Sequence, residues 1–148
     1  ERAWADEASE KVVGAFGEAS GWCRCLMTVA SLEWACKLAR NNDWVFEEEH
    51  FLTLLARDGG SAASVILAAL DAATNNAVRK TYATLLARVE TEEAAQGLAR
   101  YLGNKGVASI AQKYFKRVPG LAKRVLEPLA EGKGAEATAA KAMLASLE

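Results

Sequence analysis

The sequence predicts an all-α fold, an α-solenoid (superhelix) of about four antiparallel helical pairs. Apolar residues recur at helical spacing along almost all of the 148 residues. Ala and Leu are abundant while runs of β-branched residues are absent, and this composition favours helices over strands. The third observation is a repeat, because Asn104-Lys105-Gly106 and Gly132-Lys133-Gly134 each open a helical pattern, 28 residues apart. A period in this range is typical of stacked repeat units.

Residues 1–60 are expected to form irregular helices that cap one end of the array. The first helix presents an apolar face at four-residue steps, made by Trp4, Ala8, Val12 and Phe16. The stretch 22–40 is apolar on nearly all sides, which predicts one helix at the centre of the fold. The next helix begins near Glu47–Glu49, where acidic side chains favour the helix dipole, and ends at Asp58-Gly59-Gly60.

Residues 61–148 are expected to form regular repeats that continue the same domain. Asn75-Asn76 marks a turn, Thr91 marks a helix start, and Pro119 suits the first turn of a helix. The apolar positions between these marks are the predicted core: Val65, Ile66, Ala69, Leu70, Ala73, Val78, Tyr82, Leu85, Leu86, Val89, Ala94, Leu98, Tyr101, Leu102, Val107, Ile110, Ala111, Tyr114, Phe115, Val118, Leu121, Val125, Leu126, Leu129, Ala139, Met143 and Leu147.

Successive units of this second part can be overlaid on one another. Asn75 and Asn104 are 29 residues apart, and Leu98 and Leu126 are 28 apart. Each unit therefore contains two helices of roughly three turns, which is the dimension of a short HEAT-like repeat. The Asn75-Asn76 turn has neither Lys nor Gly, so the frame shared by all units is helix–turn–helix, and Lys-Gly is a local elaboration of the last two.

Three runs carry a resemblance to a known family: 101–107, 111–119 and 125–134. They resemble a segment of large bacterial multidomain proteins that combine a WGR domain, HEAT-like repeats and a domain of unknown function. Those proteins are often described as molybdate metabolism regulators. The likeness covers about residues 61–148, and the chain has no WGR signature. It implies the repeat segment alone, to which no catalytic residues belong.

The formal net charge of −1 hides an asymmetry between the two parts. Residues 1–60 carry 6 Lys/Arg against 11 Asp/Glu, and residues 61–148 carry 12 against 8. A balance of this size is weak compared with dedicated nucleic-acid binders. No signal peptide is visible, and no uninterrupted apolar run approaches the ~20 residues of a membrane span. We expect a cytoplasmic protein without a membrane partner, and its start at Glu1 suggests a processed chain or an excised piece.

The residues that could carry chemistry do not form a convincing site. Cys23 and Cys25 point some 200° apart on a helix, so together with Cys36 and His50 they make a poor zinc set. The carboxylates of 47–49 fan out around the helix axis and do not converge. We therefore expect no catalytic residue, no metal and no cofactor, with reduced cysteines and with Trp22 and Trp34 packed in the core.

The remaining candidates are basic residues. Lys105 and Lys133 occupy equivalent turns, and repeated turns of a solenoid line one edge. The other members of this set are Lys113, Lys116, Arg117, Lys123 and Arg124. We expect a non-catalytic scaffold that binds a protein or peptide partner, or another domain of its parent chain. The alternative is DNA binding through these residues, and a third interpretation is that the lysines only solubilise the outer face.

Overall fold

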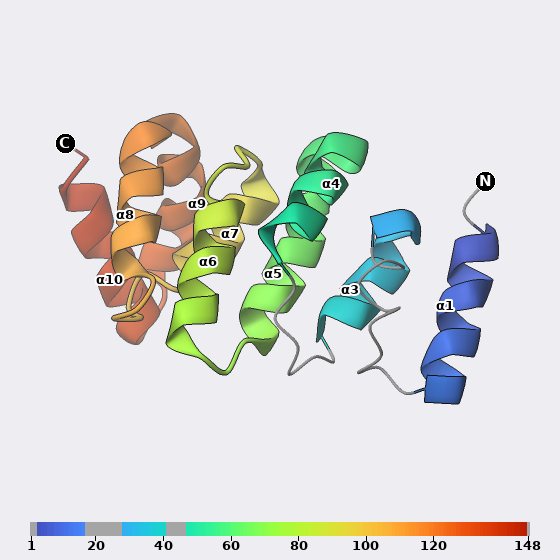
Figure 1. Cartoon of the computed structure of the whole chain (residues 1–148). Coiled ribbons are helices and arrows are strands. Elements are labelled where there is room, and N and C mark those ends of the chain that lie inside the picture. The colour runs from blue at the N-terminus through green and yellow to red at the C-terminus, as the bar shows by residue number, and fades with distance from the viewer. Residues whose placement is uncertain (1–2, 17–27, 41–46, 148) are drawn as a thin grey trace.

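The computed structural model describes residues 3–16, 28–40 and 47–147, and these residues form helices joined by turns, with no strand among them (Figure 1). The prediction of an all-α fold is confirmed. In chain order the elements are α1 (Ala3–Phe16), α3 (Leu32–Arg40), α4 (Glu48–Asp58), the 3-10 helix η1 (Gly59–Ala62), α5 (Ala63–Ala72), α6 (Asn76–Leu86), α7 (Glu92–Ala99), α8 (Ala108–Arg117), α9 (Pro119–Glu131) and α10 (Ala135–Ala145).

The helices from α4 onwards pack in two rows. The first row contains α4, α6 and α8, each in contact with the next. The second row contains α5, α7 and α9, which are in contact in the same way. In Figure 1 the chain reverses direction between the members of each pair, and the pairs follow one another across the molecule. At the two ends of the second row, α3 packs on α5 and α10 packs on α9.

Side chains at the turns fix where several helices begin. The Asn75 side chain accepts a hydrogen bond from the Ala77 N–H at 2.7 Å, and the Thr91 hydroxyl accepts one from the Ala94 N–H at 3.3 Å. Each bond satisfies a backbone donor that the first helical turn leaves without a partner. Pro119 is the first residue of α9, where its missing N–H costs nothing. The sequence signals at these three positions are therefore correct.

A continuous hydrophobic core runs along the two rows, and the core residues predicted for 61–148 are either buried in it or packed against it. Eight of them are only partly buried at the edge of this core: Val78, Tyr101, Ile110, Val118, Leu121, Leu129, Ala139 and Leu147. Its largest members are aromatic. Phe51 of α4 meets Tyr82 of α6 edge to face at 5.1 Å, and Tyr114 meets Phe115 at 5.3 Å. Fully burying one such side chain contributes roughly 1.5–3 kcal/mol, so this shared core holds neighbouring helices together.

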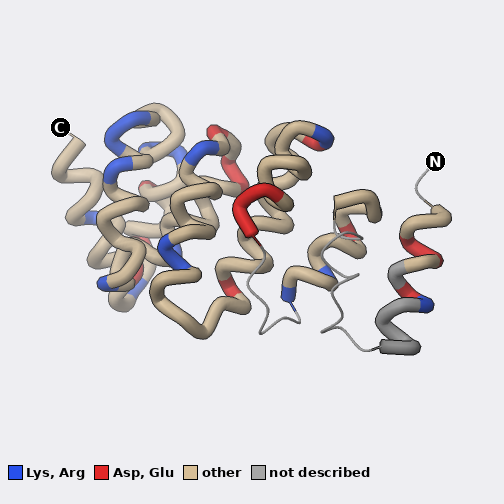
Figure 2. Tube along the Cα trace, viewed as in Figure 1, with Lys and Arg blue, Asp and Glu red and all other residues tan. Residues whose placement is uncertain are grey.

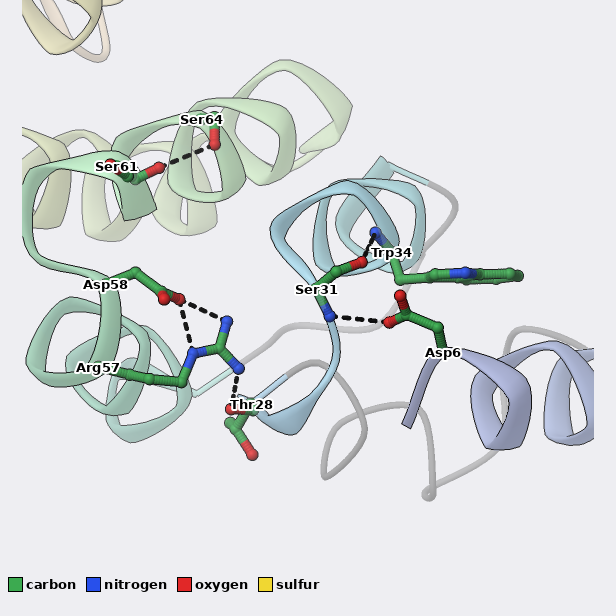
Figure 3. A network of polar contacts seen from close by, with 8 residues as sticks. All are labelled: Asp6, Thr28, Ser31, Trp34, Arg57, Asp58, Ser61 and Ser64. Atoms are coloured by element: carbon green, nitrogen blue, oxygen red, sulfur yellow. Dashed lines mark hydrogen bonds and ion pairs between the residues drawn. The ribbon is translucent and has the colours of Figure 1, made fainter. Parts of the chain in front are cut away.

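Two expectations for the N-terminal part are wrong. Within 28–40 the predicted continuous helix breaks at Ala30–Ser31, and α3 begins at Leu32. The Ser31 hydroxyl accepts a hydrogen bond from the Trp34 N–H at 3.4 Å, and the Ser31 N–H donates to Asp6 Oδ1 at 2.8 Å (Figure 3). These bonds replace the helical ones that a continuous helix would make at Ser31.

The second error concerns tryptophan. Trp4 is 63% exposed, whereas Ala5 is completely buried and Ala8 packs partly buried against the core, so the inward face of α1 includes Ala8 but not Trp4. Trp34 is half-buried rather than part of the core, and the Lys37 ammonium lies 4.8 Å from its ring centroid. Because the Lys37 ammonium must stay hydrated, the face of the Trp34 ring that it contacts lies at the surface of the protein. The other residues assigned to these faces, Val12, Phe16 and Trp22, have side chains outside the described part of the chain.

One helical stretch, Glu48–Ala72, has the length and composition of a membrane span. Its apolar side chains belong to the core of the two rows, including Phe51, Leu54 and Ile66. Arg57 and Asp58 interrupt the stretch, and at Gly59 the chain turns with a φ of 58°. Length and composition are weak indications of a membrane span, because a core helix meets the same criteria.

Arginines at the ends of first-row helices reach back to the preceding part of the chain. Arg57 donates to the Thr28 carbonyl oxygen, 29 residues earlier, at 2.5 Å, and its guanidinium is held by Asp58 (Figure 3). Arg117 donates to the Ala87 carbonyl oxygen, 30 residues earlier. Charged donors make stronger hydrogen bonds than neutral ones. The two bonds therefore connect each arginine to a part of the chain at nearly the same distance along the sequence.

Candidate interaction groove

A groove of about 610 Å³ crosses the second row of helices. Its walls come from three consecutive members of that row, α5, α7 and α9. The lining residues are Leu67, Glu92, Glu93, Gln96, Gly97, Ala99, Arg100, Arg124, Val125, Pro128 and Leu129. A hollow of this size with an apolar floor and a few polar side chains has the general character of a binding site.

The floor of the groove depends on Gly97. A Cβ atom at this position would lie 2.8 Å from Leu67 Cδ1, so the absence of a side chain lets α7 lie close against α5. Val125 and Leu129 add apolar surface from α9. Gly97 is buried, and the neighbouring Gln96, which lines the same groove, is exposed.

The rim of the groove carries charges of both signs. Glu92 and Glu93 are exposed in the first turn of α7, where the helix dipole favours acidic side chains. Gln96 Nε2 donates to Glu92 Oε1 at 3.2 Å. Arg100, two turns further along, lies 3.4 Å from Asp71 Oδ2. Within the ranges that the structure describes, no ion-pair partner lies near Glu92, Glu93 or Arg124, so these three charges remain open to a ligand.

Tyr101 holds the carboxylate that pairs with Arg100, one of the residues that line the groove. Its hydroxyl donates to Asp71 Oδ1 at 2.7 Å, which joins the end of α7 to α5. Burial, the hydrogen bond to Asp71 and the negative charge of Asp71 together raise the pKa of Tyr101 to about 12. The neutral hydroxyl thus holds the Asp71 carboxylate in place, and that carboxylate in turn pairs with Arg100.

The two lysines of the repeated turns lie at one end of the C-terminal helices. Lys105 and Lys133 are exposed, and the turns before α8 and α10 are both at the lower end of these helices in Figure 1. Asn104 Oδ1 accepts a hydrogen bond from the Gly106 N–H at 2.9 Å. A Cβ at Gly106 would lie 3.6 Å from Asn76 Oδ1, so this turn packs beside the corresponding turn of the preceding unit.

The other basic candidates are not gathered with these lysines. Lys116 and Arg117 are the last residues of α8, about 15 Å along the helix from its start. Lys123 and Arg124 follow the chain reversal into α9, and Lys113 lies in the middle of α8. Figure 2 shows basic positions at both the upper and the lower ends of these helices. The seven basic candidates therefore do not form one patch, and among them only Arg124 lines the groove.

Arg117 has a structural environment of its own. Its guanidinium donates to the Ala87 carbonyl oxygen, lies 3.3 Å from Glu90 Oε1, and stands 5.5 Å from the centre of the Tyr114 ring. Burial and the Glu90 charge raise the pKa of Tyr114, and Arg117 lowers it. The Tyr114 hydroxyl donates to the Val89 carbonyl oxygen at 3.1 Å. These contacts join α8 to the turn that follows α6, and they pair the Arg117 guanidinium within the molecule.

The residues considered for metal or acid–base chemistry stay apart where the structure describes them. Glu47, Glu48 and Glu49 are exposed, whereas His50 and Cys36 are half-buried on different helices. Among the described ranges, no three His, Cys, Asp or Glu side chains come together as a metal site. The 23–25 cysteine pair lies outside those ranges.

The groove was not predicted from the sequence, although part of its signal is visible there. Glu92, Gln96 and Arg100 follow one another at four-residue steps and so mark one polar face of α7. The sequence alone gives no reason to prefer this face over other solvated faces. Comparisons with protein-family models, with curated proteins and with solved structures gave no significant match for this chain.

Proposed function

We propose that this chain is a HEAT-like α-solenoid that acts as a non-catalytic interaction module, with the groove across α5, α7 and α9 as its binding site for a protein segment. The observation that carries the proposal is the groove of about 610 Å³, whose walls come from three successive members of one row. Stacked repeats characteristically present a continuous surface of this kind to a partner.

Three features support the solenoid part of the proposal. Each helix of one row packs on the next member of that row. The Arg57 and Arg117 bonds connect residues 29 and 30 positions apart, which matches the spacing of the sequence repeat. The α4–α5 pair joins the array in the same way as the later pairs, so the contacts favour a start at Glu48 rather than at Ser61.

The composition of the groove supports binding rather than catalysis. Glu92 and Glu93 are the carboxylates that line it, and both are exposed on its rim. Catalysis by such groups gains from a site that excludes water, which an open rim does not provide. In the resembling bacterial proteins the repeat segment accompanies other domains, so we propose that a partner or a neighbouring domain supplies the bound segment. We further propose that this interaction takes place in the cytoplasm.

A selection from a short random peptide library, displayed on phage and carried out against the whole chain, tests the proposal. Gln96→Trp would fill the groove from an exposed position without altering the core. Gln112→Trp is the matched control, because Gln112 is an exposed residue of α8 in the first row. We expect selected peptides to lose about tenfold or more in affinity for the Gln96→Trp variant and to bind the control normally. Failure to select any peptide, or equal binding to both variants, would refute the proposal.

The basic residues offer less support for the alternative of DNA binding, because they lie at two ends of the helices. A duplex-DNA titration at low and high salt examines it directly. Strong binding with a steep salt dependence, lost on Lys105→Ala plus Lys133→Ala, would replace the proposed function with this alternative.

A further inference from the structure

The unpaired charges of the groove indicate what kind of segment it takes. We infer that the groove binds an extended peptide segment in which a lysine or arginine, held by Glu92 and Glu93, is flanked by apolar residues that rest on the floor. This inference rests on the proposed function and adds the chemistry of the bound segment to it.

The first argument is the charge balance of the lining. Arg100 is neutralised by Asp71 at 3.4 Å. The charges still open are the two carboxylates of Glu92 and Glu93 and the guanidinium of Arg124, which leaves an excess of negative charge. A ligand that brings one cationic side chain balances this excess, and complementary charges favour both encounter and correct orientation. The Arg124 guanidinium, with five N–H donors, is available to the carbonyl oxygens of the bound backbone.

The second argument is the apolar surface between the charged walls. Leu67 and Leu129 are half-buried, and Pro128 is exposed, so each offers carbon surface to a ligand in the groove. Covering apolar surface contributes roughly 25 cal/mol for each Å² removed from water. The residues beside the cation of the ligand are therefore expected to be apolar.

The third argument is the size of the groove. From Glu92 to Arg100 the wall formed by α7 is about 12 Å long, at a rise of 1.5 Å per residue. A helical segment would need about eight residues to cover the same length, at 1.5 Å per residue. At about 3.3 Å per residue, three or four residues of an extended segment span the wall.

The experiment repeats the peptide selection with a charge-reversed groove, Glu92→Lys plus Glu93→Lys. We expect peptides selected on the natural chain to be enriched in Lys and Arg, and those selected on the reversed variant to be enriched in Asp and Glu. Replacing the basic residue of a selected peptide by Ala should lower its affinity by about tenfold. The control variant, Glu131→Lys plus Glu136→Lys, makes the same change of charge at exposed positions that do not line the groove and should keep the preference for basic peptides.

A proline scan of the selected peptides tests the extended conformation, because proline breaks a helix but suits an extended segment. Tolerance of proline at central positions is expected, and loss of binding at every position would overturn the extended geometry. Peptides that bind in the groove, as shown by sensitivity to Gln96→Trp, but have no charge preference would overturn this inference and leave the proposed function standing. Failure to select any peptide would overturn both.

Discussion

The first helix, α1, and the two-row stack are held to the molecule by different means. In the stack, from α4 to α9, each helix shares a hydrophobic core with its neighbours, and side chains such as Phe51, Leu86 and Phe115 are completely buried. The described side chains of α1 contribute Ala5 and Ala8, two small residues, to its packing. Its specific attachment is the bond from the Ser31 N–H to Asp6. The difference teaches that a helix of the stack gains most of its stability from apolar contact with its neighbours.

The largest expected difference between the regions comes from removing one aromatic side chain from each. Phe115→Ala should lower the free energy of unfolding by about 3–5 kcal/mol, because it leaves a cavity in the shared core. Trp4→Ala should change it by less than about 0.5 kcal/mol, since the ring is exposed. Urea unfolding followed by circular dichroism measures both. Equal losses would mean that the two regions do not differ in the way described.

The packing of neighbouring turns can be broken at Gly60. A Cβ there would lie 2.6 Å from Thr91 Cγ2, so Gly60→Ala pushes the α4–α5 turn against the residue that caps α7. We expect a loss of about 1–3 kcal/mol in the free energy of unfolding, the usual cost of overpacking. Gly103→Ala is the control, because no heavy atom lies within 4 Å of a Cβ at that position. If both substitutions behave alike, the α4–α5 turn does not pack as a member of the array.

The polar attachment of α1 is expected to have a smaller and local effect. Asp6→Ala removes the acceptor of the Ser31 N–H and should cost about 0.5–1.5 kcal/mol. Hydrogen exchange should then become faster in α1 and at the start of α3, and remain unchanged in α5 to α9. Glu7→Ala serves as the neighbouring control, because Glu7 pairs with an exposed Lys11, and such pairs contribute little. Faster exchange throughout the chain would show that α1 is essential to the stack.

The smallest expected effect is the pH dependence introduced by Tyr101. Its pKa is raised from 10.0 to about 12, so the folded state favours the neutral phenol. The corresponding stability is complete below pH 10, where the phenol is neutral in both states, and is lost as the pH rises toward 12. Tyr101→Phe should remove this component from the alkaline decline of stability. A tyrosinate absorbance titration that finds an ordinary pKa for Tyr101 would contradict the assignment.

Helices such as α8 could be predicted because they have a single apolar stripe. Val107, which caps α8, and Ala111 and Tyr114 within it are at helical spacing, and all are buried. The break at Ser31 was missed because the stretch around it is apolar on all sides and has no stripe whose end could be recognised. Trp4 was assigned to the core because it lies four residues before Ala8, but the inward face of α1 lies between the small residues Ala5 and Ala8 and leaves Trp4 exposed.

The groove could not be predicted because its lining comes from three helices separated in the sequence. Leu67 and Val125 meet in one hollow although 58 positions separate them, and this convergence depends on how closely α7 lies on α5. The sequence showed Gly97 as a glycine within a helix, but not the methyl group of Leu67 that occupies the space left by its missing side chain. The roles of Arg57 and Arg117 were hidden for the same reason, since their acceptors are backbone carbonyl oxygens, which every residue possesses.

Those two arginines also limit how such a chain can change in length. Arg57 contacts a carbonyl oxygen 29 residues earlier and Arg117 contacts one 30 residues earlier. Inserting one or two residues within a unit would rotate the following helix by about 100° per residue and move the guanidinium away from its acceptor. Adding or removing a complete helical pair would leave this rotation unchanged, and a backbone carbonyl oxygen is present at every position as a possible acceptor. Changes in length by whole helical pairs should therefore disturb these two contacts less than small insertions inside a pair.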